Sequence, residues 1–169
     1  VKLGGNVIDN EDNLNIFLSR FASIQGAKIL VHGGGKIATT IGNRLGIAPV
    51  MIDGRRVTNS ETLELVTMVY AGLINKKIVA QLQSFNCNAV GLSGADGNLI
   101  RAKMRSRIPL DFGFVGDPEI ANSQMLKNLL SKKLIPVIAP ITHNGQGQLL
   151  NTNADTIAQT IASAMSQDF

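Results

Sequence analysis

Hydrophobic residues recur along the chain at helical intervals in some segments and at strand-like intervals in others. Apolar positions spaced three and four residues apart predict helices at 10–25, 37–45, 58–84, 125–130 and 155–165. Short apolar runs predict strands at 28–31, 88–92, 99–104, 112–115 and 135–141. Strands that alternate with helices are typical of an α/β domain. We therefore expect a largely parallel sheet covered by helices on both faces, with small antiparallel excursions.

Polar residues at the predicted helix starts suggest how these helices are capped. Asn10 is a candidate N-cap for the first helix. Thr58 followed by Glu61 forms a capping-box pattern before the helix that runs to Ser84. Asp155 is the candidate cap of the last helix. Apolar residues cover most faces of the 58–84 helix, so we expect it to be mostly buried.

Two glycine-rich loops each follow a predicted strand and precede a predicted helix. Gly4 and Gly5 come after Lys2, and residues 33–35 come after His32. Such loops let the backbone approach a ligand, and the helix N-terminus behind them favours an anion. The carboxyl ends of parallel strands meet at one edge of a sheet, where ligands commonly bind. The loops match neither the dinucleotide nor the Walker pattern, and tight strand-to-helix packing is the alternative explanation for their glycines.

Basic side chains follow several of these turns. Lys2 has the reach to place a compact cation on phosphate oxygens. Asp53 and Gly54 form a strong two-residue hairpin signal, and Arg55 and Arg56 come directly after it. These arginines are suited to bind a carboxylate bidentately, or they flank a solvated hairpin. The alternating basic residues over 101–107 are expected to form a solvated strand face.

Composition narrows the function classes. With 169 residues, 44% hydrophobic and 17% charged, the chain suits one compact domain. A net charge of +4 suits an anionic ligand, and an aromatic content of 4% without tryptophan argues against a nucleic-acid stacking platform. One cysteine and two histidines give no disulfide and no zinc site. No apolar run is long enough to span a bilayer, so we expect a cytoplasmic protein with neither membrane nor nucleic-acid partners.

A serine hydrolase is a remote alternative. The segment 91–95 is close to a nucleophile elbow, and the triple glycine resembles an esterase oxyanion loop. Ser93, then Asp111 or Asp117, then His143 follow the order serine, acid, histidine. An elbow needs a helix directly after its serine, whereas here glycines and strand-like residues follow.

Five segments together resemble the N-acetylglutamate kinases of the amino acid kinase superfamily in order and spacing. The resemblance runs the length of the chain, and its arginine motif and Asn-x-Asn-Ala-Asp motif are particular to that family. The segments are Lys2–Gly5, Val31–Gly35, Asp53–Thr58, Gly91–Gly97 and Gly147–Asp155.

The resemblance implies a three-layer αβα sandwich with a mainly parallel open sheet. It implies that an amino-terminal lobe binds the acylated glutamate and a carboxy-terminal lobe binds ATP. The reaction would be phosphorylation of the side-chain carboxylate of N-acetyl-L-glutamate, the second step of arginine biosynthesis. ATP with Mg²⁺ would be the co-substrate, with no metal site built from the protein. A homodimer is expected, and the 58–84 helix is the candidate for part of its contact.

The resemblance also implies residue roles. Lys2 would stabilise the transferring phosphoryl group, and Asp155 would orient Lys2. Backbone amides that would bind the ATP phosphate come from Gly5 and Gly34. The residues that would hold the acylated glutamate, with the arginine on a carboxylate, are Gly34, Gly35, Arg56, Asn151 and Asn153.

The chain departs from the family at its end. Family members continue with a strand that carries nucleotide-binding residues and a helix that supplies a second catalytic lysine. We therefore expect residues 1–169 to be a single domain, the amino-acid lobe, with most of the ATP-binding lobe absent from this sequence. Both ends look cut. Two further alternatives keep the fold: a kinase of another N-acyl-glutamate such as N-succinyl-glutamate, and a catalytically inactive amino-acid-binding module.

Overall fold

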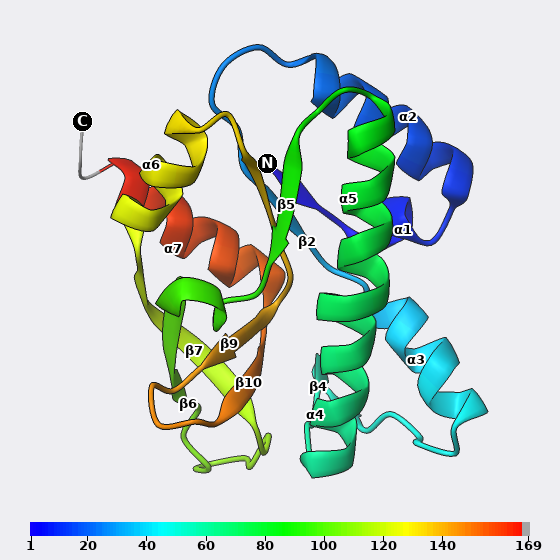
Figure 1. The fold of residues 1–169 in the computed structure, drawn as a ribbon. Helices are drawn as coiled ribbons and strands as arrows, with labels where there is room; N and C mark the ends of the chain where they lie inside the picture. Colours follow the sequence, from blue (N-terminus) through cyan, green and yellow to red (C-terminus); the bar gives the residue numbers. More distant parts are fainter. Residues whose placement is uncertain (167–169) are drawn as a thin grey trace.

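A four-stranded parallel sheet forms the centre of the computed structural model, which describes residues 1–166 (Figure 1). Its strand order is β1-β2-β8-β5. The strands are β1 (Lys2–Leu3), β2 (Leu30–His32), β8 (Ile135–Ile138) and β5 (Ala89–Leu92). Every neighbouring pair is parallel, which confirms the sequence expectation for this part of the fold.

Side chains of the central strands alternate between two hydrophobic cores. Leu30 and Val137 belong to one core, and their neighbours Val31 and Ile138 belong to the other. Successive residues of a strand point to opposite faces, so a sheet whose strands are apolar throughout must be covered on both sides. The helices supply that cover, and the three-layer αβα sandwich is confirmed.

The helices divide between the two faces. In Figure 1, α2 and α5 lie on one side of the sheet, and α6 and α7 lie on the other. The first side also contains the short α1, with α3 and α4 beyond it. The helices are α1 (Gly5–Ile8), α2 (Glu11–Ser23), α3 (Gly35–Arg44), α4 (Ser60–Val66), α5 (Asn75–Ser84), α6 (Ser123–Ser131) and α7 (Ala154–Ser166). Between α4 and α5 the helix continues through a π-helical stretch, η1 (Thr67–Ile74).

A second group of four strands closes on itself beside the central sheet, an arrangement the sequence does not predict. It consists of β6 (Ile100–Met104), β7 (Val115–Ala121), β9 (Ile141–His143) and β10 (Leu149–Thr152), with the short helical turn η2 (Asp96–Asn98) before it. The prediction of one strand over 135–141 is wrong, because the chain leaves β8 before Pro140, which has no N–H to donate, and enters β9. The prediction at 112–115 is also wrong, since Gly113 turns the chain at φ +71° and the strand starts at Val115.

The predicted hairpin at Asp53 and Gly54 is confirmed. It joins β3 (Met51–Ile52) to β4 (Arg55–Arg56), which pair in antiparallel register. Asp53 has φ +49° and Gly54 has φ +73°, the left-handed pair that a tight two-residue turn requires. The register pairs Arg56 with Met51 and leaves Arg56 buried while Arg55 is exposed.

One of the three predicted helix caps is confirmed and two are wrong. The Asn10 side chain accepts a hydrogen bond from the Asn13 amide at 2.9 Å, as expected. At the next predicted cap, Asn59 rather than Thr58 is the N-cap and accepts from the Thr62 amide at 2.8 Å. An N-cap must be extended and must stand immediately before the first helical residue, and Asn59 meets both conditions with φ −76° and ψ −177°.

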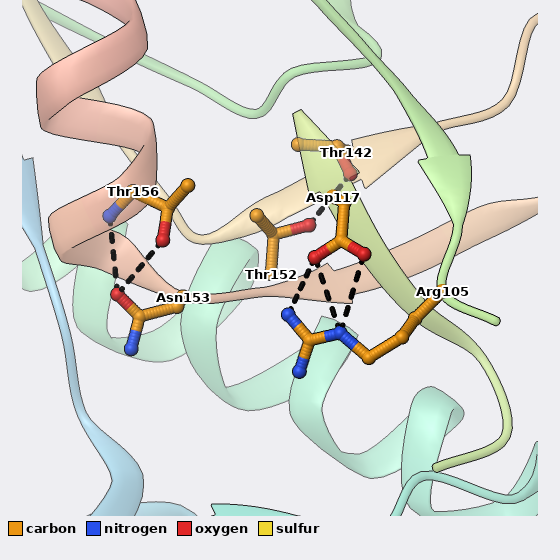
Figure 2. A network of polar contacts seen from close by, with 6 residues as sticks. All are labelled: Arg105, Asp117, Thr142, Thr152, Asn153 and Thr156. Atoms are coloured by element: carbon orange, nitrogen blue, oxygen red, sulfur yellow. Dashed lines mark hydrogen bonds and ion pairs between the residues drawn. The ribbon is translucent and has the colours of Figure 1, made fainter. Parts of the chain in front are cut away.

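The last helix is also capped by a residue other than the expected one, because Asn153, two positions before Asp155, is the N-cap. The Asn153 side-chain oxygen accepts from the Asp155 amide at 2.8 Å. It also accepts from the Thr156 amide at 3.1 Å (Figure 2). Asp155 therefore lies inside the first turn of α7, and its carboxylate is free for another partner. Within residues 1–166, no helix is long and apolar enough to cross a membrane.

Replacing the observed cap of α4 tests this assignment. Asn59→Ala is expected to lower the free energy of unfolding by about 1 kcal/mol, because the Thr62 amide loses its acceptor. Urea denaturation measures the change. Asn59→Ser is the matched control, since serine retains an acceptor oxygen and should recover most of the loss. Equal stabilities of the alanine and serine variants would contradict the assignment.

Candidate functional site

The two glycine loops lie side by side at the carboxyl ends of β1 and β2. The Gly33 amide donates to the Leu3 carbonyl at 3.1 Å. A Cβ atom placed on Gly33 would lie 3.8 Å from the Leu3 oxygen and 4.0 Å from the Gly5 nitrogen. The parallel pairing of the two strands thus brings both loops to the same edge of the sheet, as the sequence predicts.

A cavity of about 460 Å³ opens at this edge. It draws its lining from the two glycine loops, from the β4 arginine motif and from the junction between β10 and α7. All eight residues selected from the sequence line this one cavity: Lys2, Gly5, Gly34, Gly35, Arg56, Asn151, Asn153 and Asp155.

Lys2 and Asp155 form an ion pair at the mouth of the cavity. The lysine Nζ lies 3.0 Å from Asp155 Oδ1, and the two side chains are 32% and 70% exposed. Asn153 sets this geometry by capping α7, because the cap fixes the first helical turn in which Asp155 stands. A pair this accessible to water is weak, so the ammonium remains available to an incoming anion.

Gly34 forms the N-terminus of α3 under tight steric constraint. Its φ of +146° suits glycine, and a Cβ atom there would lie 2.2 Å from the Ile74 side chain. No side chain caps this helix. The amides of its first turn are therefore open toward the cavity, and the helix dipole favours an anion at that point.

Arg56 is buried against α3. Its Nη2 donates to the Gly35 carbonyl at 3.0 Å and to the Thr39 hydroxyl at 2.8 Å. Tyr70 lies beside it: burial raises the pKa of the Tyr70 hydroxyl, and the Arg56 charge opposes that rise. The guanidinium is thereby fixed in orientation while it lines the cavity, which suits a charge-assisted contact with a carboxylate.

Asn151 is tied to the arginine strand through one hydroxyl. Its Nδ2 donates to Thr58 Oγ1 at 3.0 Å, and that hydroxyl donates to the Arg56 carbonyl at 3.2 Å. Below it, the buried hydroxyls of Thr142 and Thr152 lie 2.7 Å apart and join β9 to β10 (Figure 2). These hydrogen bonds fix the position of Asn151 and of the strands behind it on this side of the cavity.

Comparison with known proteins identifies the family. The sequence profile described as the amino acid kinase family matches residues 1–168. The chain belongs to the amino acid kinase family.

Several curated relatives of the chain are acetylglutamate kinases. The chain is 55% identical over 166 residues to an acetylglutamate kinase of Cytophaga hutchinsonii, and the match covers 98% of this chain and 63% of the relative. Identity to the acetylglutamate kinase of Bacteroides fragilis is 53%, covering 100% of this chain and 65% of the relative. Identity to the acetylglutamate kinase of Methanopyrus kandleri is 42%, covering 99% of this chain and 67% of the relative. The chain thus spans about two thirds of the length of these relatives.

Solved structures agree on the fold. The smu.665 protein of Streptococcus mutans superimposes with a TM-score of 0.82 at 24% identity, covering 98% of this chain and 67% of that one. The N-acetylglutamate synthase of Neisseria gonorrhoeae, complexed with coenzyme A and N-acetyl-glutamate, also gives a TM-score of 0.82, at 20% identity over 97% of this chain and 38% of that one.

One basic residue of the cavity is not predicted as a site residue from the sequence. Arg105 lines the cavity and is held by Asp117, which accepts from its Nε at 3.1 Å (Figure 2), and it lies 5.7 Å from the centre of the Phe112 ring. The expectation of a solvated basic face over 101–107 holds for Arg101, Lys103 and Arg107, which are exposed. It is wrong for Arg105, because this residue follows the end of β6, and only the β6–β7 pairing brings Asp117 within reach.

The serine hydrolase alternative is not supported by the geometry. The Ser93 hydroxyl donates to Asp96 at 2.8 Å within a turn, and the three-residue helical turn η2 and the strand β6 follow it instead of an α-helix. His143 accepts from the Gly145 amide through Nδ1. Within residues 1–166 no hydrogen bond joins Ser93 to a histidine.

His32, at the base of the triple-glycine loop, is fully buried. Burial lowers its pKa from 6.5 to about 4; the hydrogen bond to Gly33 opposes that shift and the Lys76 charge adds to it. The imidazole is therefore neutral in the folded protein at neutral pH.

This buried histidine predicts a pH dependence of stability. The unfolded chain binds the proton at higher pH than the folded chain, so the His32 contribution is complete above pH 6.5 and is lost as pH falls toward 4. A shift of that size corresponds to about 3 kcal/mol. Denaturation curves at several pH values should show a smaller loss of stability in His32→Asn than in the unmodified protein. Parallel pH profiles for the two would contradict the assignment.

Proposed function

We propose that the complete protein is an acetylglutamate kinase, which transfers the γ-phosphoryl group of ATP to the side-chain carboxylate of N-acetyl-L-glutamate. The observation that carries this proposal is the 55% identity, over 98% of the chain, to a relative of that name. The cavity supports it independently, because cations and free amides line it at the edge of a parallel sheet. Residues 1–169 supply the acylglutamate side of the site in this proposal.

The substrate carries two carboxylates and an amide, and the cavity offers a partner for each. Arg56 presents a fixed guanidinium to one carboxylate. Asn151 offers its side-chain amide, and the first-turn amides of α3 at Gly34 and Gly35 suit the other carboxylate. Asn153 supports this side of the cavity by capping α7.

The chemistry requires alignment and charge neutralisation. The side-chain carboxylate is already a nucleophile, so no general base is required, and the protein has to hold it in line with the transferring phosphoryl group. Lys2, with the amides of Gly5 and Gly34, stabilises charge on the equatorial oxygens. Asp155, 3.0 Å from the lysine, keeps its ammonium at the mouth of the cavity.

The co-substrate is ATP with Mg²⁺. Among residues 1–166 no group of three or more histidine, cysteine, aspartate or glutamate side chains could hold a metal. In this proposal the Mg²⁺ would be held mainly by phosphate oxygens and water, and its chemistry would be to neutralise phosphate charge.

The proposal extends to assembly and location. Met68 and Leu73 are exposed on the long helix, 58% and 45% respectively, which suits a homodimer contact there. Cys87 is buried and unpaired, which is consistent with a cytoplasmic protein.

Arg56→Ala in the complete protein tests substrate binding. The KM for N-acetyl-L-glutamate is expected to rise by about 10- to 100-fold, because a charge-assisted contact is lost, with a smaller change in kcat. Initial-rate kinetics measure both constants. Arg44→Ala is the control, since Arg44 is exposed at the end of α3 and does not line the cavity. An unchanged KM in Arg56→Ala would sink the substrate role of this arginine.

Lys2→Ala tests the phosphoryl role. Its kcat is expected to fall by about 100- to 1000-fold, since a cation at the transferring group is removed. The control is Lys36→Ala, because Lys36 is exposed and its nearest carboxylate, Asp9, is 3.9 Å away. A Lys2→Ala enzyme of undiminished kcat would remove this lysine from the mechanism.

A further inference from the structure

A fully buried polar pair lies directly beneath the triple-glycine loop, and the family resemblance assigns no role to either of its residues. The pair consists of His32, at the end of β2, and Asn75, at the start of α5. Both have 0% exposed surface. Buried polar groups at this depth are costly unless each one is hydrogen-bonded, so their partners can be followed atom by atom.

The partners fix the orientation of both side chains. Asn75 Nδ2 lies 2.9 Å from the Val137 carbonyl, which can only accept, so the amide nitrogen faces β8 and β2. The same nitrogen lies 3.2 Å from His32 Nε2, which therefore accepts. His32 Nδ1 lies 2.8 Å from the Gly33 carbonyl, which again only accepts, so Nδ1 carries the proton and donates.

Asn75 is itself held from the far side. Its Oδ1 accepts from Lys76 Nζ at 3.0 Å, and the same ammonium donates to the Gly91 carbonyl at 3.1 Å. A Cβ atom on Gly91 would lie only 1.9 Å from Asn75 Oδ1, so the side chain fills the space that this glycine leaves. The amide has no room to rotate and no spare donor, and the network is fully satisfied.

The hydrogen bond from His32 determines which way the glycine loop faces. In a trans peptide the C=O and the following N–H point in opposite directions. Anchoring the Gly33 oxygen to the buried imidazole therefore directs the Gly34 N–H away from the core. Ile74, the residue before Asn75, fills the space where a Gly34 side chain would lie. Two adjacent helical residues therefore fix the orientation of the Gly33–Gly34 peptide and the space beside Gly34.

We propose that His32 and Asn75 are positioning residues that lock the Gly33–Gly34 peptide with its N–H aimed at the transferring phosphoryl group. This inference rests on the proposed function for its catalytic consequence. Its structural premise, the Nδ1–H tautomer donating to Gly33, stands apart from activity. Neither side chain lines the cavity, so both act through the glycine loop.

The tautomer is the first test, and it needs no turnover. Long-range ¹H–¹⁵N correlation spectra of the complete protein at pH 7 are expected to show His32 with a protonated Nδ1 and an unprotonated Nε2. A protonated Nε2 would overturn the inference, because the Gly33 carbonyl would then have lost its donor. That result would leave the proposed function untouched.

Two substitutions of His32 by an amide side chain then test the catalytic consequence. His32→Asn retains a donor near the Nδ1 position and loses the reach to Asn75, whereas His32→Gln reaches toward Asn75 and lacks the near donor. Both bury one amide in place of the imidazole, so their losses in Tm should be similar. We expect kcat to fall by about 10- to 100-fold in His32→Gln and by at least tenfold less in His32→Asn, with the KM for N-acetyl-L-glutamate changing less than kcat.

The outcomes separate the two claims. Equal kcat losses in the two variants would overturn the positioning role. An unmodified protein that fails to phosphorylate N-acetyl-L-glutamate would overturn the proposed function, and the tautomer measurement would still decide whether the loop is anchored as described.

Discussion

The parallel pairing of β1 with β2 is the constraint on which the site depends. Lys2 pairs with Val31 and Leu3 pairs with His32, so the two strands end at the same level. The chain must then leave both strands through glycine loops at one edge of the sheet, where the Gly33 amide bonds the Leu3 carbonyl. A shift of one residue in this register would turn Lys2 to the opposite face and separate the two loops. The meeting of Lys2 and the two glycine loops at one cavity follows from this alignment.

The long helix from Ser60 to Ser84 fixes the site from the core side. Tyr70 lies against the buried arginine, Ile74 fills the space beside Gly34, and Asn75 holds the histidine beneath the loop. The helix before Asn75 is π-helical, because the Asn75 amide donates to the Tyr70 carbonyl five residues earlier. Such stretches are rare and frequently occur at functional sites. The neutral core residues thus set the geometry of the site, including the position of the buried Arg56, while Lys2 and Asp155 remain accessible to water.

Local sequence signals predict much of this arrangement. Features that depend on contacts between distant segments are not predicted. Glycine runs after short strands and the Asp53–Gly54 turn depend on the backbone preferences of a few residues, so the loops and the hairpin could be predicted. The caps at Asn59 and Asn153 were missed because capping depends on the φ and ψ of one residue, and each has a polar neighbour of similar capping preference. Arg105 was missed because its position depends on pairing between β6 and β7. The closed group of four strands likewise depends on contacts that no local pattern encodes.

We propose that this cavity holds an acylated glutamate with its side-chain carboxylate ready for phosphorylation. The most direct measurement is to incubate the complete protein with ATP, Mg²⁺ and N-acetyl-L-glutamate in the presence of hydroxylamine, which traps an acyl phosphate as its hydroxamate. We expect ADP and hydroxamate in equal amounts, and little of either when unacylated L-glutamate replaces the substrate. ATP hydrolysis without hydroxamate, or no turnover with N-acetyl-L-glutamate, would contradict it.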